Sequence, residues 1–254
     1  MKYNDINGIS SLKKAFLILE QLSEAPYEYT PTLLAQKTGI NRTTIHRILR
    51  ELADFDVVIK NELTKTYRIG PNIYRMGSVY LHNLNFRSKL EEILNIISQE
   101  SKESVGLAIR DEGKIISLYE MEIFQPLKMN YKPGLFYPMN RGCYGKCLMA
   151  YYDEDKVKEL LYSQKFEKIS TNTLTDPEEI LAEYKKIREQ GFVVSDEEAF
   201  DYAMGVGIPI FDSKGNVSTC VAISFLKQAN YKEKIEELKE ILFKHADELS
   251  RYIP

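Results

Sequence analysis

A run of basic and hydroxyl side chains between residues 41 and 50 has the chemistry of a DNA-binding surface. The run consists of Arg42, Thr43, Thr44, His46, Arg47 and Arg50, and no acidic residue interrupts it. Arginine can form paired hydrogen bonds with guanine or phosphate, and threonine offers a hydroxyl group and a methyl group that can contact thymine. A merely solvated helix face usually mixes both signs of charge. The run therefore favours a recognition helix over an ordinary solvated face.

A second cluster that could bind a ligand lies at residues 141–146, where Arg-Gly-Cys-Tyr-Gly-Lys follows Pro138. Glycine lets a backbone approach a bound group closely. If this segment opens a helix, its free amide hydrogens and the helix dipole favour a carboxylate or a phosphate. A tight turn that needs glycine only for its shape explains the same residues, and residue types alone leave both interpretations open.

The three cysteines suggest metal or redox chemistry only weakly. Cys143 and Cys147 are four residues apart, so they share one face of a helix, and Cys220 is distant in sequence. There is no CxxC pair, and the three histidines lie elsewhere. A thiol at a helix start can be activated, but we expect buried, unreactive thiols, no metal and no cofactor.

Catalysis is the main alternative of a different class. The carboxylates of residues 196–198 (Asp-Glu-Glu) could supply a general base. Acidic clusters usually lie on solvated surfaces, however, and the sequence lacks the GxxxxGK[ST], GxSxG and HExxH motifs. We therefore expect a protein that is not an enzyme.

Helical spacing of apolar residues predicts two helices ahead of the basic run. The first covers residues 12–25, with Ser11 as its cap. The second begins at Thr30-Pro31, because threonine is a good N-cap and proline is tolerated at the first helical position, and Gly39 ends it.

Asn41 then caps a helix over residues 42–55 that carries the basic run. Two β-rich segments, residues 57–60 and 66–70, flank a polar turn and predict a hairpin. Three helices followed by a hairpin form a winged helix-turn-helix, which we assign to residues 1–70. The candidate DNA-binding residues are Thr32, Asn41, Arg42, Thr43, Thr44, His46, Arg47, Arg50, Lys65 and Arg68.

Residues 71–86 are predicted to form a linker helix and residues 87–254 an α+β domain. The linker carries a stripe at helical spacing made of Ile73, Met76, Val79-Tyr80 and Leu84. The predicted helices of the larger domain are 85–101, 142–152, 154–162, 177–190 and 231–252. Its predicted strands are 104–110, 115–122, 127–131, 205–211 and 217–225. Hairpin-linked strands interleaved with helices indicate a largely antiparallel sheet.

Charge and composition fit this division. Residues 1–87 hold 12 Lys and Arg against 8 Asp and Glu, a net charge of +4, whereas the whole chain of 254 residues carries −3. A basic N-terminal third suggests an anionic partner there. No apolar run approaches the ~20 residues of a membrane span, and the start of the chain lacks a signal-peptide core. We expect a cytoplasmic protein without a membrane partner.

The sequence resembles the IclR family of bacterial regulators over residues 10–252. The resemblance rests on Leu-Leu-Ala at 33–35, Gly-Ile at 39–40, residues 43–49 with Leu52, and Tyr-Arg-Ile-Gly-Pro at 67–71. It continues through residues 138–146, 176–178, 187–192, 196–198 and 209–212. It implies a GAF-like α/β effector domain after the linker helix, and linker helices that help to pair two chains. A homodimer on a near-palindromic operator follows, and dimers of dimers are common in the family. The family holds repressors and activators, and we expect a repressor.

The resemblance also implies a ligand pocket. The matching positions are Met129, Tyr137, Cys143, Tyr144, Gly145, Ser195, Gly205, Ala222 and Ser224. Ser195 replaces an aspartate, Gly205 a cysteine and Ala222 a serine of the members that bind small keto acids, and Tyr144 is larger than usual. Glyoxylate or pyruvate is therefore not assumed, and a sugar acid or aromatic acid is the carboxylate expected. The alternative is a C-terminal domain that only assembles oligomers.

Overall fold

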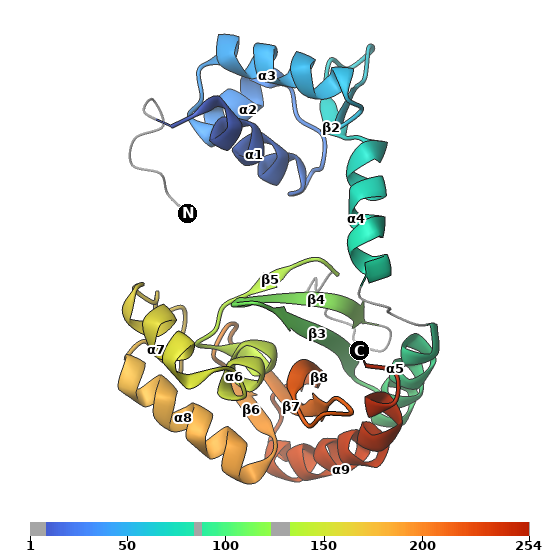
Figure 1. The fold of residues 1–254 in the computed structure, drawn as a ribbon, viewed down its shortest axis with the longest axis vertical. Coiled ribbons are helices and arrows are strands. Elements are labelled where there is room, and N and C mark those ends of the chain that lie inside the picture. The colour runs from blue at the N-terminus through green and yellow to red at the C-terminus, as the bar shows by residue number, and fades with distance from the viewer. Residues whose placement is uncertain (1–8, 84–87, 123–132, 254) are drawn as a thin grey trace. The chain divides into compact units, whose positions relative to one another are not determined.

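The computed structural model describes residues 9–83, 88–122 and 133–253, and the chain divides into two compact units, Met1–Leu84 and Asn85–Pro254 (Figure 1). The expected α+β architecture is confirmed. The elements of the first unit are α1 (Ser11–Leu22), α2 (Pro31–Thr38), α3 (Arg42–Asp54), β1 (Val58–Lys60), β2 (Tyr67–Ile69) and α4 (Pro71–Asn83).

Local capping chemistry sets the helix ends of the first unit. The Thr30 hydroxyl accepts from the Leu33 amide, and Gly39 ends α2 with a left-handed φ of 72°, as its lack of a Cβ permits. The Asn41 side chain accepts from the Thr43 amide at 2.8 Å and starts α3. These caps agree with the sequence prediction.

The prediction for α1 was wrong at both ends. Ser10, not Ser11, is the cap, because Ser10 has an extended backbone and its hydroxyl accepts from the Lys13 amide. The helix ends at Leu22 rather than near residue 25, since the amide and hydroxyl of Ser23 both donate to the Leu19 carbonyl and close the last turn. Ile18 and Leu22 pack against α2, α3 and the hairpin in one core.

The second unit is built on a six-stranded antiparallel sheet of order β5-β4-β3-β8-β7-β6. Its strands are β3 (Ser104–Asp111), β4 (Lys114–Met121), β5 (Phe136–Tyr137), β6 (Val193–Asp196), β7 (Ala203–Phe211) and β8 (Val217–Leu226). Its helices are α5 (Ser88–Ser101), α6 (Gly142–Ala150), α7 (Glu154–Tyr162), α8 (Pro177–Gln190) and α9 (Tyr231–Ser250).

Successive side chains along each strand point to opposite faces of the sheet, so each face has its own hydrophobic core. Ala108 and Cys220 point to the face covered by α6 and α8, whereas Leu107 and Val221 point to the face covered by α5 and α9 (Figure 1). The cavity described below lies on the α6 face.

The sequence analysis did not predict β5 or β6. It also predicted one strand that cannot be compared with the structure. Strand β5 has only two residues, and β6 ends in the polar pair Ser195-Asp196, so neither shows an apolar pattern. The predicted strand 127–131 lies outside the described residues. The predicted ends of α6 and α9 were each two residues too far along the chain.

Candidate DNA-binding surface and ligand cavity

The basic run lies on α3 with its polar side chains exposed. Arg42, Thr43, His46, Arg47 and Arg50 are exposed, and Thr44 is partly buried. The opposite side of the helix buries Ile45, Ile48 and Leu49, which are at most 2% exposed. The buried side anchors α3 in its unit, so the basic side is held outward.

A groove beside α3 gathers part of the predicted surface. It measures about 760 Å³ and runs between the start of α2, α3 and the hairpin. The predicted residues that line it are Thr32, Arg42, His46, Arg50 and Lys65. Asn41, Thr43, Thr44, Arg47 and Arg68 are not among its lining residues. Lys60, at the end of the first predicted strand of the hairpin, also lines the groove.

Several cations of this surface already have acidic partners. Arg47 pairs with Glu51 at 2.7 Å and donates to the Ser11 hydroxyl, and Glu62 holds both Lys60 and Lys65. Among the described residues, Arg42 and Arg50 have no such partner. An anion entering the groove therefore meets these two guanidinium groups without displacing a carboxylate.

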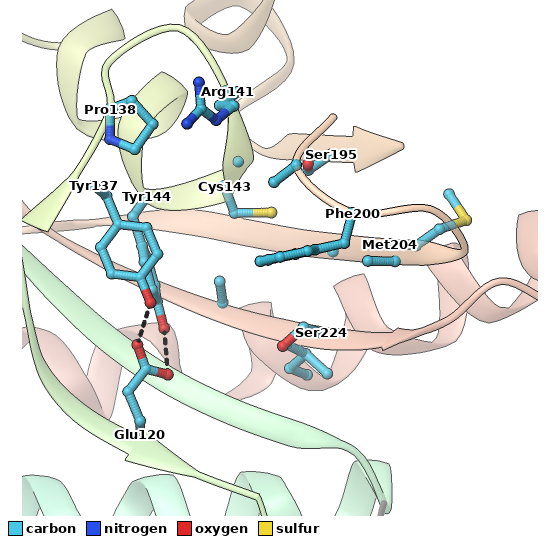
Figure 2. A pocket seen from close by; sticks show the side chains of 16 residues that line it. Glu120, Tyr137, Pro138, Arg141, Cys143, Tyr144, Ser195, Phe200, Met204 and Ser224 are labelled. Carbon is cyan, nitrogen blue, oxygen red and sulfur yellow. Dashed lines mark hydrogen bonds between the residues drawn. The ribbon is translucent and has the colours of Figure 1, made fainter. Parts of the chain in front are cut away.

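The cavity of the second unit lies between α6 and the sheet. It encloses about 100 Å³ and is shown in Figure 2. Seven of the residues assigned to the pocket line it, namely Tyr137, Cys143, Tyr144, Ser195, Gly205, Ala222 and Ser224. Met129 lies outside the described residues. The residues assigned from the family resemblance do not include the other lining residues, which are Glu120, Pro138, Arg141, Gly142, Ala199, Phe200, Ala203, Met204 and Ile223. Of these, Arg141 and Gly142 belong to the candidate segment 141–146.

Gly145 does not line the cavity, in contrast to its assignment from the sequence. A Cβ on Gly145 would lie 1.9 Å from the carbonyl oxygen of Pro138, so glycine is needed there for helix α6 to pack against the preceding loop. Its role in the structure is close packing beside the cavity.

Strand register brings distant cavity residues into one row. Ser195 on β6 pairs with Gly205 on β7, and Gly205 pairs with Ser224 on β8. A Cβ on Gly205 would lie 2.7 Å from the Cys143 sulfur. The glycine therefore lets α6 approach the sheet at the point where the two serines reach the cavity wall.

Glu120 occupies one end of the cavity and was not expected from the sequence. The hydroxyl of Tyr137 donates to Oε1 at 3.0 Å, and that of Tyr144 donates to Oε2 at 3.2 Å (Figure 2). Burial raises the pKa of Glu120 to about 8, although both hydrogen bonds oppose the rise. The carboxyl group is therefore mostly uncharged at neutral pH.

Arg141 lines the cavity at the end away from Glu120 (Figure 2). It is partly buried, and this burial lowers the pKa of the guanidinium, while exposed Glu167 opposes the shift. Its side chain forms no hydrogen bond or ion pair within the described part of the chain. The cavity thus has a cationic end and an uncharged acidic end, separated by mainly apolar walls that include Phe200 and Met204.

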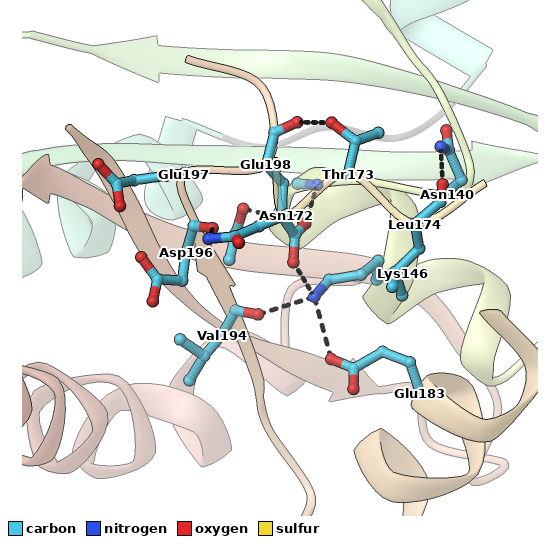
Figure 3. Close-up of polar contacts among 12 residues, drawn as sticks. Asn140, Lys146, Asn172, Thr173, Leu174, Glu183, Val194, Asp196, Glu197 and Glu198 are labelled. Carbon is cyan, nitrogen blue, oxygen red and sulfur yellow. Dashed lines mark hydrogen bonds and ion pairs between the residues drawn. The ribbon is translucent and has the colours of Figure 1, made fainter. Parts of the chain in front are cut away.

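One amide at the start of α6 is already bound to a carboxylate of the protein itself. The Gly142 amide already donates to Oε2 of Glu198 at 2.8 Å. Oε1 of the same carboxylate accepts from the Lys146 ammonium at 2.5 Å (Figure 3). The protein therefore supplies its own carboxylate to the helix N-terminus.

Lys146 is the centre of a buried polar network. Besides Glu198, it binds Glu183 on α8 at 3.0 Å and the Val194 carbonyl on β6 at 2.8 Å (Figure 3). Burial by itself lowers the pKa of Lys146, but Glu198 and Glu183 outweigh burial and leave it raised. The network joins α6, α8, β6 and the segment after β6.

The acidic triplet 196–198 is structural, and its expected solvated position was wrong for Glu198, which is 6% exposed. Asp196 and Glu197 both bind the Lys227 ammonium at 2.6 Å. All three carboxylates thus have partners that fix the segment next to the cavity.

The cysteines are buried thiols, as expected. Burial raises the pKa of both Cys143 and Cys220, which suppresses the reactive thiolate. Within residues 9–83, 88–122 and 133–253, no group of three or more His, Cys, Asp or Glu side chains could hold a metal ion. In the same ranges, no helix combines the length and apolarity needed to cross a membrane.

Fold and surface together define a class, a winged helix-turn-helix DNA-binding protein with a separate α/β domain. Residues 11–61 match the model of the IclR helix-turn-helix domain, and residues 78–251 match that of the bacterial transcriptional regulator IclR C-terminal domain. The chain belongs to the IclR family of transcriptional regulators.

Similar proteins span the whole chain. The HTH-type transcriptional regulator KdgR of Escherichia coli is 26% identical over 96% of this chain and 92% of its own length. The DNA-binding transcriptional repressor YiaJ of the same organism is 27% identical over 92% and 85%. An IclR homologue from Microbacterium hydrocarbonoxydans, solved in complex with 4-hydroxybenzoate, has the same fold with a TM-score of 0.76 at 19% identity, covering 94% and 99%. The relatives are regulators, and this chain is a transcriptional regulator rather than an enzyme.

Proposed function

We propose that this protein is a cytoplasmic repressor that binds a near-palindromic operator as a homodimer and is controlled by a small carboxylic acid. One observation carries the proposal: a helix with an exposed basic face and a cavity with a guanidinium at one end lie in separate units of one chain. Its repressor character is supported by the relative YiaJ, which is a repressor.

The DNA-reading role is divided between bases and phosphates. The N-terminal part of α3, with Arg42, Thr43 and His46, would reach base edges, as recognition helices do. Lys60 and Lys65 on the hairpin would contact the phosphate backbone. Arg42 and Arg50 are the strongest candidates because they need not leave an acidic partner.

The apolar face of α4 supports pairing with a second copy. Ile73 packs on its own unit, but Met76, Val79, Tyr80 and Tyr74 remain exposed, Tyr74 by 80%. A helix with such a face is stabilised by a partner that covers it. Met76, Val79 and Tyr80 of the predicted stripe are thus available to a second α4, while Leu84 lies outside the described residues. A dimer of dimers is the further assembly that the family suggests.

An acid fits the cationic end of the cavity. A carboxylate bound to Arg141 would form a charge-assisted, paired hydrogen bond in a partly buried site. The Microbacterium homologue, solved with an aromatic acid, supports the same ligand class. Binding would alter the operator affinity if the acid favours one arrangement of the dimer, typically by about 1–3 kcal/mol.

The DNA half of the proposal is tested by selecting operator sequences from random DNA and measuring their affinities. Arg42→Ala and Arg50→Ala should each weaken the selected site by about 1–3 kcal/mol, whereas Lys65→Ala should weaken all sequences alike and reduce the salt dependence. Lys185→Ala, an exposed change on α8, is the control. Unchanged affinity in both arginine variants would refute the assignment of α3.

The ligand half is tested by thermal unfolding in the presence of a library of carboxylic acids. A ligand at 100 times its dissociation constant stabilises by about 2.7 kcal/mol. Arg141→Met should abolish the shift, and the acid should release operator DNA. If no acid in the library raises the unfolding temperature while operator binding is intact, a C-terminal domain that only assembles oligomers is favoured.

A further inference from the structure

The end of the cavity opposite Arg141 is a built hydrogen-bonding site. Glu120, Gly106, Ala222 and Gly207 lie opposite one another on β4, β3, β8 and β7, so three small residues follow the carboxylic acid across the sheet. A Cβ on Gly106 would lie 1.9 Å from the Tyr144 hydroxyl and 2.2 Å from Oε2 of Glu120. The missing Cβ of Gly106 is what lets the tyrosine reach the acid.

The surroundings of Glu120 favour a neutral polar partner over a cation. Within residues 9–83, 88–122 and 133–253, the groups that act on it are the hydroxyls of Tyr137, Tyr144 and Ser117 and the like charge of Glu122, and none of these is cationic. An uncharged carboxylic acid can donate as well as accept a hydrogen bond. A ligand hydroxyl, which also does both, is the group that such a site binds best.

We propose that Glu120, Tyr137 and Tyr144 form a subsite for a hydroxyl group of the effector, which is therefore a hydroxylated carboxylic acid with its carboxylate toward Arg141. This inference rests on the proposed function, since it deepens the choice of effector. The cavity of about 100 Å³ limits the ligand. An engineered cavity of about 150 Å³ in another protein holds benzene, so the smaller volume here favours a short-chain hydroxy acid, and a single-ring acid is the upper limit of size.

Matched pairs of acids with and without a hydroxyl test the subsite directly. Suitable probes are propionate with lactate, butyrate with 3- and 4-hydroxybutyrate, and benzoate with 3- and 4-hydroxybenzoate, each titrated calorimetrically at neutral pH. In at least one pair the hydroxylated acid should bind at least about tenfold more tightly than the plain acid. A plain acid has no hydroxyl group to offer the subsite, so it leaves buried polar groups unpaired.

Variants at Glu120 separate the subsite from the rest of the cavity. Glu120→Ala should remove the preference for the hydroxylated acid, whereas the isosteric, uncharged Glu120→Gln should keep most of it. Glu159→Gln, the same change at an exposed residue of α7, should behave like the unmodified protein. Thermal unfolding of each variant confirms that it is folded.

The pH dependence of affinity gives an independent readout. With a pKa of about 8, Glu120 becomes charged between pH 7 and pH 9, so an anionic effector should bind about tenfold more weakly at pH 9. In Glu120→Gln this loss should vanish. The other titratable groups beside Glu120 are the hydroxyls of Tyr137 and Tyr144 and the carboxyl group of Glu122, and Glu120→Gln leaves all three in place. Burial raises the pKa of the Cys143 thiol and keeps it protonated.

The outcomes distinguish this inference from the function it rests on. If acids bind but the hydroxylated and plain members of every pair bind equally, the subsite is wrong and the acid effector stands. Tighter binding at pH 9 than at pH 7 would also overturn the subsite, since Glu120 would then act as a charged carboxylate. If no acid binds at all, the acid effector and the subsite both fail.

Discussion

The DNA-binding surface and the cavity present their polar groups in opposite ways. On α3 the functional side chains are exposed and project from a helix whose other side provides the packing. Around the cavity, Glu120, Cys143 and Ser195 belong to the same buried or partly buried layer that holds α6 on the sheet. We therefore expect that function and stability can be changed separately in the first unit but are coupled in the second.

The largest effect is expected from Lys146→Met, which leaves Glu198 and Glu183 without their buried cation. Removing one partner of a buried ion pair costs about 3–5 kcal/mol. The unfolding transition of the second unit, followed in urea, should move accordingly. Lys158→Met breaks an exposed pair with Glu154 on α7 and should cost under about 1 kcal/mol. If Lys146→Met and Lys158→Met lowered the free energy of unfolding equally, the expected contrast between buried and exposed polar groups would be wrong.

Next is the pH dependence of stability that Glu120 imposes. Its pKa rises from 4.5 in the unfolded chain to about 8 in the folded state. Between these values the unfolded state has lost a proton that the folded state retains, so the free energy of unfolding falls as pH rises, by on the order of 4 kcal/mol. Glu120→Gln should flatten this part of the curve, measured by urea unfolding from pH 5 to pH 8. Parallel curves for the two proteins would mean that Glu120 is ionised when folded.

Gly145→Ala should have a somewhat smaller effect, of about 2–3 kcal/mol. The new methyl group would collide with the Pro138 backbone and push α6 away from the loop beside the cavity. Both stability and ligand affinity should fall, as coupling in the second unit requires. Gly77→Ala on α4 is the matched control: a Cβ there meets nothing within 4 Å, and alanine should stabilise the helix by up to about 1 kcal/mol. Loss of ligand affinity without loss of stability would contradict the coupling.

The smallest effect is expected from Glu51→Ala in the first unit. The exposed pair with Arg47 contributes about 0.3–0.5 kcal/mol to stability. Its loss frees the Arg47 guanidinium, so operator affinity should rise by about twofold at low salt while the unfolding transition hardly moves. A large fall in stability would show that the exposed face of α3 is not separable from its core.

Much of the first unit could be predicted because its signals are local. Thr30, Gly39 and Asn41 act on backbone groups within three or four residues, and the apolar spacing of Ile45, Ile48 and Leu49 places the basic side chains on the opposite face. The error at Ser11 is also local: a neighbouring serine has the same capping chemistry, and only the backbone angles distinguish Ser10.

The cavity depends on contacts that sequence spacing does not encode. The family resemblance supplied Ser195, Gly205 and Ser224 as one set, but the register across β6, β7 and β8 explains why they meet. It placed Gly145 in the pocket as well, where the structure shows a packing role. Arg141 lay within the chosen segment and was not selected, because nothing in the sequence shows which way it points.

By itself, the sequence determined the order of the units, the caps of α2 and α3, the antiparallel class of the sheet and the basic face of α3, since each depends on residues near one another in the chain. Only the tertiary structure decided the chemistry of the cavity. Glu120 shows why: strict alternation along β4 would place it on the face opposite Ile115, but the register shift opposite Leu107 and Ala108 turns it toward α6. Its raised pKa then comes from burial among residues distant in sequence.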